Sequence, residues 1–330
     1  VTVAFRVELP ELFSVTGSEY EAVHSAWHKA VKVLPEYSIV HKQDFFIEEK
    51  YRPETDRDDL SFLSRSFERH FNERPFLNHF CYLFLTKTTK ARSRQESTFS
   101  TLCKGRLVPK EIEDRETVTR FLEAVGQFEK IMNDSGFVTL RRLTTDEITG
   151  TERSAGIVEK YLSLSQHDTT VLKDIQLNPE EMRIGDDILC LHTLSDTEDL
   201  PGKVATDSRY ERLSTDRSDC RLSFAAPVGL LLDCNHCYNQ YIFIDDHGEN
   251  LKRFEQTARN MHSLSRYSRS NQINKAWIEE YLNEAHSKGL TSVRCHCNVM
   301  AWSDDREELR RIKNEVGSQL ALMECKPRHN

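Results

Sequence analysis

Glycine and proline are scarce in this sequence, which has 12 Gly and 9 Pro among its 330 residues. So small a share excludes collagen-like, mucin-like and other low-complexity chains. An excess of charge of one sign is also lacking, because 45 Lys and Arg against 53 Asp and Glu leave a net charge of −8. That charge is too small to prevent collapse into a core, and its sign disfavours a predominantly basic nucleic-acid-binding protein. The sequence therefore predicts a moderately acidic globular protein.

Long apolar runs are lacking as well. The longest, residues 225–232, has 8 residues, whereas a membrane-spanning helix needs about 20. The chain opens at Val1 with the alternation of a strand and without the pattern of a signal peptide. Its nine cysteines are an odd number, which makes a poor disulfide framework and indicates a reducing compartment. We therefore expect a cytoplasmic fragment of a longer polypeptide.

Apolar periodicity in the first half alternates between strand and helix patterns. A capping box at residues 18–21 predicts the start of one helix, Asp58 or Asp59 is expected to begin a second, and Asp114 a third. Four apolar residues of the second helix form one stripe: Leu60, Leu63, Phe67 and Phe71. The expected strands are residues 3–9, 37–51, 80–85 and 137–143, and a short helix is expected within 151–164.

The second half repeats this mixture of patterns. The expected strands are residues 188–191, 222–233, 238–245 and 291–302, and the expected helices are 250–264, 271–286 and one that begins at Asp305. Both halves therefore indicate an α/β (α+β) fold with two mixed α/β subdomains, residues 1–170 and residues 171–330. No RecA-like ATPase domain is expected within this chain.

Four cysteines are candidate zinc ligands. Cys234 and Cys237 have C-x-x-C spacing, and Cys295 and Cys297 follow 58 residues later, so the two pairs offer four soft donors for a tetrahedral ion. The alternative is structural, because Cys295 and Cys297 share one face of a strand with Val293, Val299 and Ala301. We expect both thiols to be buried in the core and the cysteines to be reduced and free of metal.

Asp245 and Asp246 follow the apolar residues 241–244, as the acids of a Walker B strand do. Such a strand needs a phosphate-binding loop, and no G-x-x-x-x-G-K-[ST] motif occurs in the sequence. A buried strand that ends in a turn explains the two acids without a metal. The H-E-x-x-H, G-x-S-x-G and G-x-G-x-x-G motifs are absent too. The residues by themselves identify no enzymatic reaction.

Residues 87–110 carry a local excess of positive charge. Seven basic side chains lie there against one acid, Glu96: Lys87, Lys90, Arg92, Arg94, Lys104, Arg106 and Lys110. This basic segment is either a solvated loop or a contact surface for a partner, and an acidic protein surface is favoured over nucleic acid as that partner. Whether nucleic acid also binds the chain stays open.

Several blocks of the sequence resemble the N-terminal region of conjugative-transposon TraG proteins. These blocks are residues 3–10 (VAFRVELP), 24–30 (HSAWHKA), 62–67 (FLSRSF), 70–80 (HFNERPFLNHF) and 81–89 (CYLFLTKTT). The resemblance extends over nearly all 330 residues and is most distinctive in the first ninety. TraG proteins are similar to the type IV secretion ATPases of the TraC/TrbE/CagE class.

The resemblance implies a cytoplasmic component, peripheral at the inner membrane, that energises conjugative DNA transfer. Its implied partners are its own C-terminal ATPase domain, inner-membrane components of the mating apparatus and further copies in a hexamer. ATP and Mg²⁺ would bind that ATPase domain, which is expected after residue 330, so this fragment is expected to be a docking and assembly region with no cofactor and no catalytic residues. The alternative is an independent metal- or nucleotide-dependent enzyme that uses Cys234, Cys237, Cys295 and Cys297, or Asp245 and Asp246.

Overall fold

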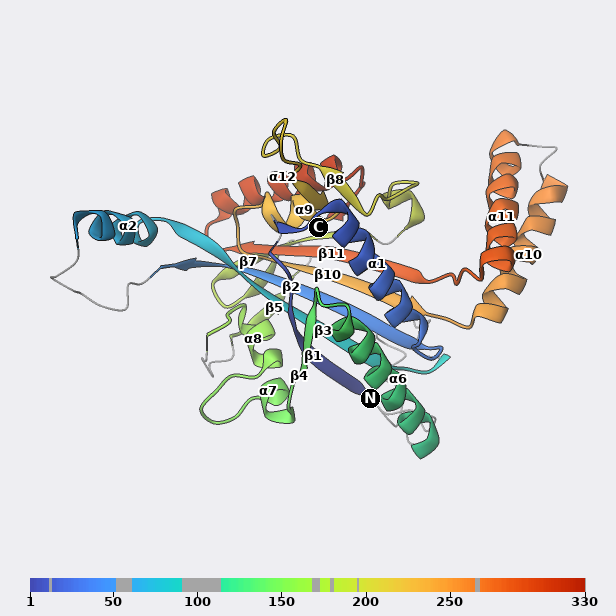
Figure 1. Cartoon of the computed structure of the whole chain (residues 1–330), viewed down its shortest axis with the longest axis horizontal. Coiled ribbons are helices and arrows are strands. Elements are labelled where there is room, and N and C mark those ends of the chain that lie inside the picture. Colours follow the sequence, from blue (N-terminus) through green and yellow to red (C-terminus); the bar gives the residue numbers. More distant parts are fainter. Residues whose placement is uncertain are drawn as a thin grey trace.

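The computed structural model describes residues 1–11, 14–51, 61–90, 114–167, 173–178, 181–194, 196–264 and 268–329. These residues form a mixed α/β fold around a large antiparallel sheet (Figure 1), which confirms the fold class predicted from the sequence. The sheet strands in spatial order are β4 (Thr139–Arg142), β1 (Thr2–Glu8), β3 (Pro75–Lys87), β2 (Ser38–Lys50), β10 (His236–Ile244), β11 (Arg294–Ser303), β7 (Asp187–Leu194), β6 (Met182–Ile184) and β5 (Ile175–Leu177). A further strand, β12 (Arg328–His329), pairs with β7, and β8 (Asp207–Arg209) pairs with β9 (Arg221–Ser223) in a separate ribbon.

The pairing of β2 with β10 joins the two halves of the chain. It runs without a break from Ser38 opposite Ile244 to Phe46 opposite His236. The sheet is therefore continuous across the subdomain boundary that the sequence suggests near residue 170.

One face of the sheet, called here the α1 face, carries Val40, Lys42, Asp44 and Phe46 of β2. Helices α1 (Gly17–Lys32) and α6 (Arg115–Asp134) pack on its first half. Helices α9 (Ala226–Leu230) and α12 (Arg306–Leu322) pack on its second half. Eight residues of the first core are at most 1% exposed: Phe5, Ala30, Val40, Leu83, Leu85, Phe121, Val125 and Phe128.

The opposite face, called here the α8 face, carries His41, Phe45 and Ile47 of β2. Helix α8 (Ile157–Ser163) follows the short helix α7 (Thr145–Thr149) and packs against it. Ile157 of α8 contributes to a third buried cluster with Phe45. The rings of Phe45 and Tyr161 meet edge to face with their centroids 5.9 Å apart.

Side-chain caps fix where the helices begin. Asp114 caps α6 as predicted, and its carboxylate accepts a hydrogen bond from the Thr117 backbone N–H. The capping box of α1 joins Thr16 to Glu19, so the box predicted at residues 18–21 was placed two residues too late. A further helix, α11 (Arg269–Lys288), ends at Gly289, whose φ of 63° is the left-handed conformation that favours glycine.

The prediction of a strand over residues 222–233 was wrong. Only residues 221–223 are extended there, as β9, and the chain then turns into α9. Pro227 lies in the first turn of α9. Proline lacks the N–H that a strand would use in its ladder, and its fixed φ suits the first turn of a helix.

Two elements project from opposite ends of the molecule (Figure 1). At one end, β2 extends past Phe46, the last of its residues that pairs with β10. The part of β3 opposite this extension, residues 75–78, lies outside the ladder with β1, so β2 and β3 pair there only with each other. They lead to α2 (Phe62–Asn72), and we call residues 47–50, 61–74 and 75–78 the β2–β3 arm. At the other end, α10 (His247–Leu264) and α11 pack against each other as a helical hairpin. Within the described residues, no helix has the length and apolarity needed to cross a membrane.

Candidate functional site

The basic segment predicted from the sequence is described at only two of its seven cationic positions. Lys87, at the end of β3, donates to the carbonyl oxygen of Glu36, and its ammonium lies 5.7 Å from the centre of the Tyr37 ring. Lys90 forms an ion pair with Glu249 of α10. Both lysines thus contact the chain itself. The other five cationic residues lie outside the described part of the chain: Arg92, Arg94, Lys104, Arg106 and Lys110.

The four cysteines proposed as a zinc set do not converge. The ladder places Cys297 opposite Gln240 and therefore on the α1 face, whereas Cys237 lies on the α8 face. Cys234 is buried in the second core of the α1 face. Cys295 was expected to be buried but is exposed, because it lies near the start of β11, beyond the part of the strand that α12 covers.

Asp245 and Asp246 both have structural partners. The Asp245 side chain is 3% exposed and accepts two hydrogen bonds from the Arg294 guanidinium, from Nε at 2.6 Å and from a terminal nitrogen at 3.1 Å. The Asp246 carboxylate accepts a hydrogen bond of 2.9 Å from the Glu249 backbone N–H in the first turn of α10. This arrangement agrees with the structural interpretation of the two acids, a strand end followed by a helix start.

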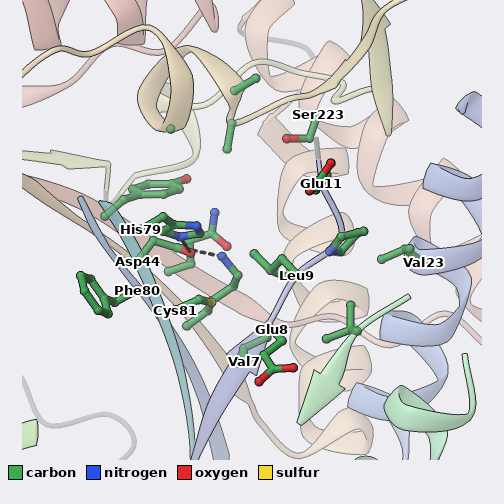
Figure 2. Close-up of a pocket in the computed structure, with 18 of the residues that line it drawn as sticks. Val7, Glu8, Leu9, Glu11, Val23, Asp44, His79, Phe80, Cys81 and Ser223 are labelled. Atoms are coloured by element: carbon green, nitrogen blue, oxygen red, sulfur yellow. Dashed lines mark hydrogen bonds and ion pairs between the residues drawn. The ribbon is translucent and has the colours of Figure 1, made fainter. Parts of the chain in front are cut away.

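A cavity of about 590 Å³ opens on the middle of the α1 face (Figure 2). Its floor is formed by β2, β3 and β10, and its walls come from the segment after β1, the first turns of α1 and residues 223–229. Seven of the lining side chains are apolar and come from both the floor and its surroundings: Val7, Leu9, Val15, Val23, Phe46, Val138 and Ala226. Glu8 and Glu11 also line the cavity.

Four polar side chains meet on the cavity floor. Lys42 pairs with Asp44, and Asp44 Oδ1 lies 2.9 Å from His79 Nε2 (Figure 2). Cys81 lies directly opposite Asp44 in the β2–β3 ladder. Ligand atoms of Asp44, His79 and Cys81 all lie within 4.8 Å of one another, and this is the only such group of three or more His, Cys, Asp or Glu among the described residues.

The charges on this floor are set by burial and by neighbouring groups. Burial alone would disfavour an ionised carboxylate at Asp44, but Lys42 and His79 outweigh it and hold the pKa of Asp44 well below its usual range. Burial raises the pKa of the Cys81 thiol, so the side chain is protonated near neutral pH. The floor thus holds an ion pair next to a neutral thiol.

The His79 ring is held by a stack of three rings. The Phe46 ring lies between His79 and His236, with centroid distances of 4.5 Å to each and interplanar angles of 4° and 12°. His236 is fully buried, and its two ring nitrogens lie 2.8 Å and 2.9 Å from the carbonyl oxygens of Cys234 and Val228. The stack therefore fixes the plane in which His79 presents Nε2 to Asp44.

The β2–β3 arm exposes Leu63, Phe67 and Phe71 of the predicted apolar stripe, and the fourth residue of that stripe, Leu60, lies outside the described part of the chain. Phe62, Leu63 and Phe67 of α2 are 83%, 78% and 62% exposed, and α2 has no buried residue. Phe71 is 44% exposed and has the Phe67 ring at 4.6 Å. The prediction of a helix was right, and its apolar stripe is exposed because the arm carries α2 away from the body of the sheet.

The α10–α11 hairpin exposes a second set of apolar side chains. Trp277 and Ile273, four residues apart on α11, are 66% and 44% exposed. Phe254 of α10 and Tyr281 of α11 pack against each other with ring centroids 5.0 Å apart, so the hairpin is closed by its own contacts.

A comparison with models of protein families matches the beginning of the chain. Residues 1–25 match a family described as "Domain of unknown function, B. Theta Gene description (DUF3875)". The matched region contains β1 and the first turns of α1, and several of its residues line the cavity. No curated protein matches the chain.

Proposed function

We propose that this chain is the non-catalytic N-terminal docking and assembly region of a conjugation ATPase of the TraC/TrbE/CagE class. In this proposal it lies in the cytoplasm against the inner membrane and links its own C-terminal ATPase domain to inner-membrane components of the mating apparatus. The sequence resemblance to TraG proteins and the lack of a phosphate-binding loop support the assignment.

The observation that carries the docking role is the exposed stripe on α2. Isolated apolar side chains are common on protein surfaces, but a contiguous group of large ones marks an interaction site. Phe62, Leu63 and Phe67 lie on one short helix at the end of a two-stranded arm. Burying each would contribute roughly 1.5–3 kcal/mol, so a partner that covers the stripe gains several kcal/mol.

The position of the stripe favours a partner over the chain's own core. The arm holds α2 at one end of the long axis, on the opposite side of the body from the α10–α11 hairpin (Figure 1). An apolar helix held out on a strand pair presents its side chains to a groove of another protein. We therefore assign α2 as the element that docks on a protein of the mating apparatus.

The test is a triple substitution in the full-length protein, Phe62→Ser, Leu63→Ser and Phe67→Ser. We expect conjugative transfer to fall about tenfold or more and co-purification with the mating apparatus to be lost. The unfolding midpoint should change little, since exposed side chains contribute within about 0.5 kcal/mol each. The matched control is Asn72→Ser, an exposed polar residue of the same helix about 180° from Leu63. Normal transfer by the triple variant would refute the docking role of α2.

A further inference from the structure

We propose that Asp44, His79 and Cys81 form a zinc site on the floor of the central cavity. The proposal is independent of the docking function and concerns a different part of the molecule. It departs from the sequence-based expectation that the cysteines are free of metal and that the chain carries no cofactor.

The strand geometry brings the three ligands to one point. His79 and Cys81 are two residues apart on β3 and so point to the same face. Asp44 lies directly opposite Cys81 on β2, and its side chain is on that face too. Ligand atoms bound to one tetrahedral zinc lie about 3.3–3.7 Å apart, given bonds of about 2.0–2.3 Å. The ligand atoms of Asp44, His79 and Cys81 lie within 4.8 Å of one another. Small side-chain rotations would bring them to the separation that zinc requires.

The three types of donor atom favour zinc over other divalent ions. A carboxylate, an imidazole and a thiolate together match zinc, because thiolate is a poor ligand for Mg²⁺ or Ca²⁺ and imidazole and carboxylate are both common on zinc. Ionised Asp44 and Cys81 would supply two negative charges, which balance the divalent ion. Three protein ligands leave a fourth position, and here that position faces the cavity of about 590 Å³.

A cation already occupies this floor. The ammonium of Lys42 pairs with Asp44 and lies beside Cys81. The Lys42 side chain is 25% exposed, so it can withdraw into the cavity, where Glu8 and Glu11 provide other carboxylates. Zinc would therefore take the place of the ammonium, and Lys42 should weaken metal binding by competing for Asp44.

The supporting contacts suit a metal ligand. The Phe46 ring lies parallel to the His79 ring at 4.5 Å and restricts its rotation. Asp44 is 5% exposed at its side chain, and Cys81 is buried. Asp44 and Cys81 are therefore held by burial, whereas His79 is exposed and is held by the Phe46 ring on one face. Ligands restricted in this way lose less conformational freedom on binding an ion.

The apolar walls define what the fourth position would accept. Val7, Leu9, Val23 and Val138 surround the floor, and a volume of this size matches a small-molecule pocket. The open position would take water or the carboxylate or thiolate of a small molecule with an apolar body. The walls then contact that body, and the zinc binds its polar end.

The test is a titration of the purified, metal-free chain with Co²⁺, followed by competition with Zn²⁺ against a chromophoric chelator. We expect one equivalent to bind with a thiolate-to-cobalt charge-transfer band. Cys81→Ser should abolish the band, and Asp44→Asn or His79→Gln should lower affinity about tenfold or more. Lys42→Met keeps all three ligands and removes the competing ammonium, so it should raise affinity about tenfold.

The matched control is Cys190→Ser, which removes a buried thiol of another core. It should leave the band unchanged. The proposal is overturned if neither the wild-type chain nor the folded Lys42→Met variant shows the band. It is also overturned if the band survives Cys81→Ser or is lost on replacing Cys234 and Cys297 instead.

Discussion

His236 of β10 lies directly opposite Phe46 of β2, and their rings stack with centroids 4.5 Å apart. The pair belongs to the ladder that joins the two halves of the chain. On its other side, Phe46 stacks on His79, a side chain of the cavity floor. One aromatic ring thus connects the junction of the two halves to the candidate metal site.

Phe46→Ala should destabilise the whole chain. Phe46 is 9% exposed and loses both stacking partners on truncation, so the expected cost in the free energy of unfolding is about 3–5 kcal/mol. Urea denaturation followed by circular dichroism measures it. The control, Phe62→Ala, changes an 83% exposed ring and should cost no more than about 0.5 kcal/mol. Equal effects of the two substitutions would contradict the structure.

Acid should weaken the fold through His236. Burial lowers the pKa of His236 to about 4, and the carbonyls of Cys234 and Val228 oppose that shift only in part. The unfolded histidine titrates near 6.5, so between these values the unfolded state binds more protons. Stability is therefore full above pH 6.5 and falls as the pH falls towards 4, by about 3 kcal/mol from this residue.

Urea denaturation at several pH values between 4.5 and 7 tests this dependence. His236→Gln should reduce the slope of unfolding free energy against pH by up to about 1.4 kcal/mol per pH unit. Part of the slope should remain, because burial also lowers the pKa of His41 and of His296. An unchanged slope in the variant would show that His236 is charged in the folded protein.

Local signals in the sequence predicted much of the fold. Asp114 predicted the start of α6, whose buried face includes Phe121, Val125 and Phe128. Asp305 predicted the start of α12, whose buried residues are Ile312, Val316 and Leu320. These features depend on neighbours within a few residues, which the sequence shows directly.

Features that depend on distant parts of the chain could not be predicted in this way. Periodicity shows that Leu63 and Phe67 share a helix face, but not whether anything covers that face. The cavity floor was missed for a similar reason. The predicted strand began at Phe80 and so left out His79, which the structure places on β3 with Cys81. Asp44 joins them only through the register of β2 with β3, 37 residues away from Cys81.

Asp245→Asn should affect stability and not nucleotide binding. The buried carboxylate accepts two hydrogen bonds from Arg294, and its replacement should cost about 1–3 kcal/mol in the free energy of unfolding. The exposed Asp233→Asn is the control. Calorimetric titration of the chain with Mg·ATP should give no heat of binding. A micromolar dissociation constant that is lost in Asp245→Asn would support the alternative of a nucleotide-dependent enzyme.

Charge reversal in the basic segment should impair conjugative transfer without changing the stability of the fold. The sequence predicts a solvated loop or a contact surface for this segment. Replacing Arg92, Arg94, Lys104 and Arg106 by Glu should then leave the unfolding midpoint nearly unchanged, because surface substitutions cost about 0.5 kcal/mol or less. The same variant of the full-length protein should depress conjugative transfer, because an acidic partner surface would be repelled. Unimpaired transfer would show that the segment is only a solvated loop, and loss of folding would show that it is structural.

The most direct test of the docking function is site-specific photo-crosslinking from α2 in donor cells. A photoreactive amino acid in place of Phe67 in the full-length protein should crosslink to an inner-membrane component of the mating apparatus. The same amino acid in place of the exposed Asn72, which lies about 140° from Phe67 and about 180° from Leu63 around the helix, should give a much weaker product. Equal crosslinking from the two positions, or none from position 67 in cells that transfer DNA, would contradict the assignment of α2 as the docking element.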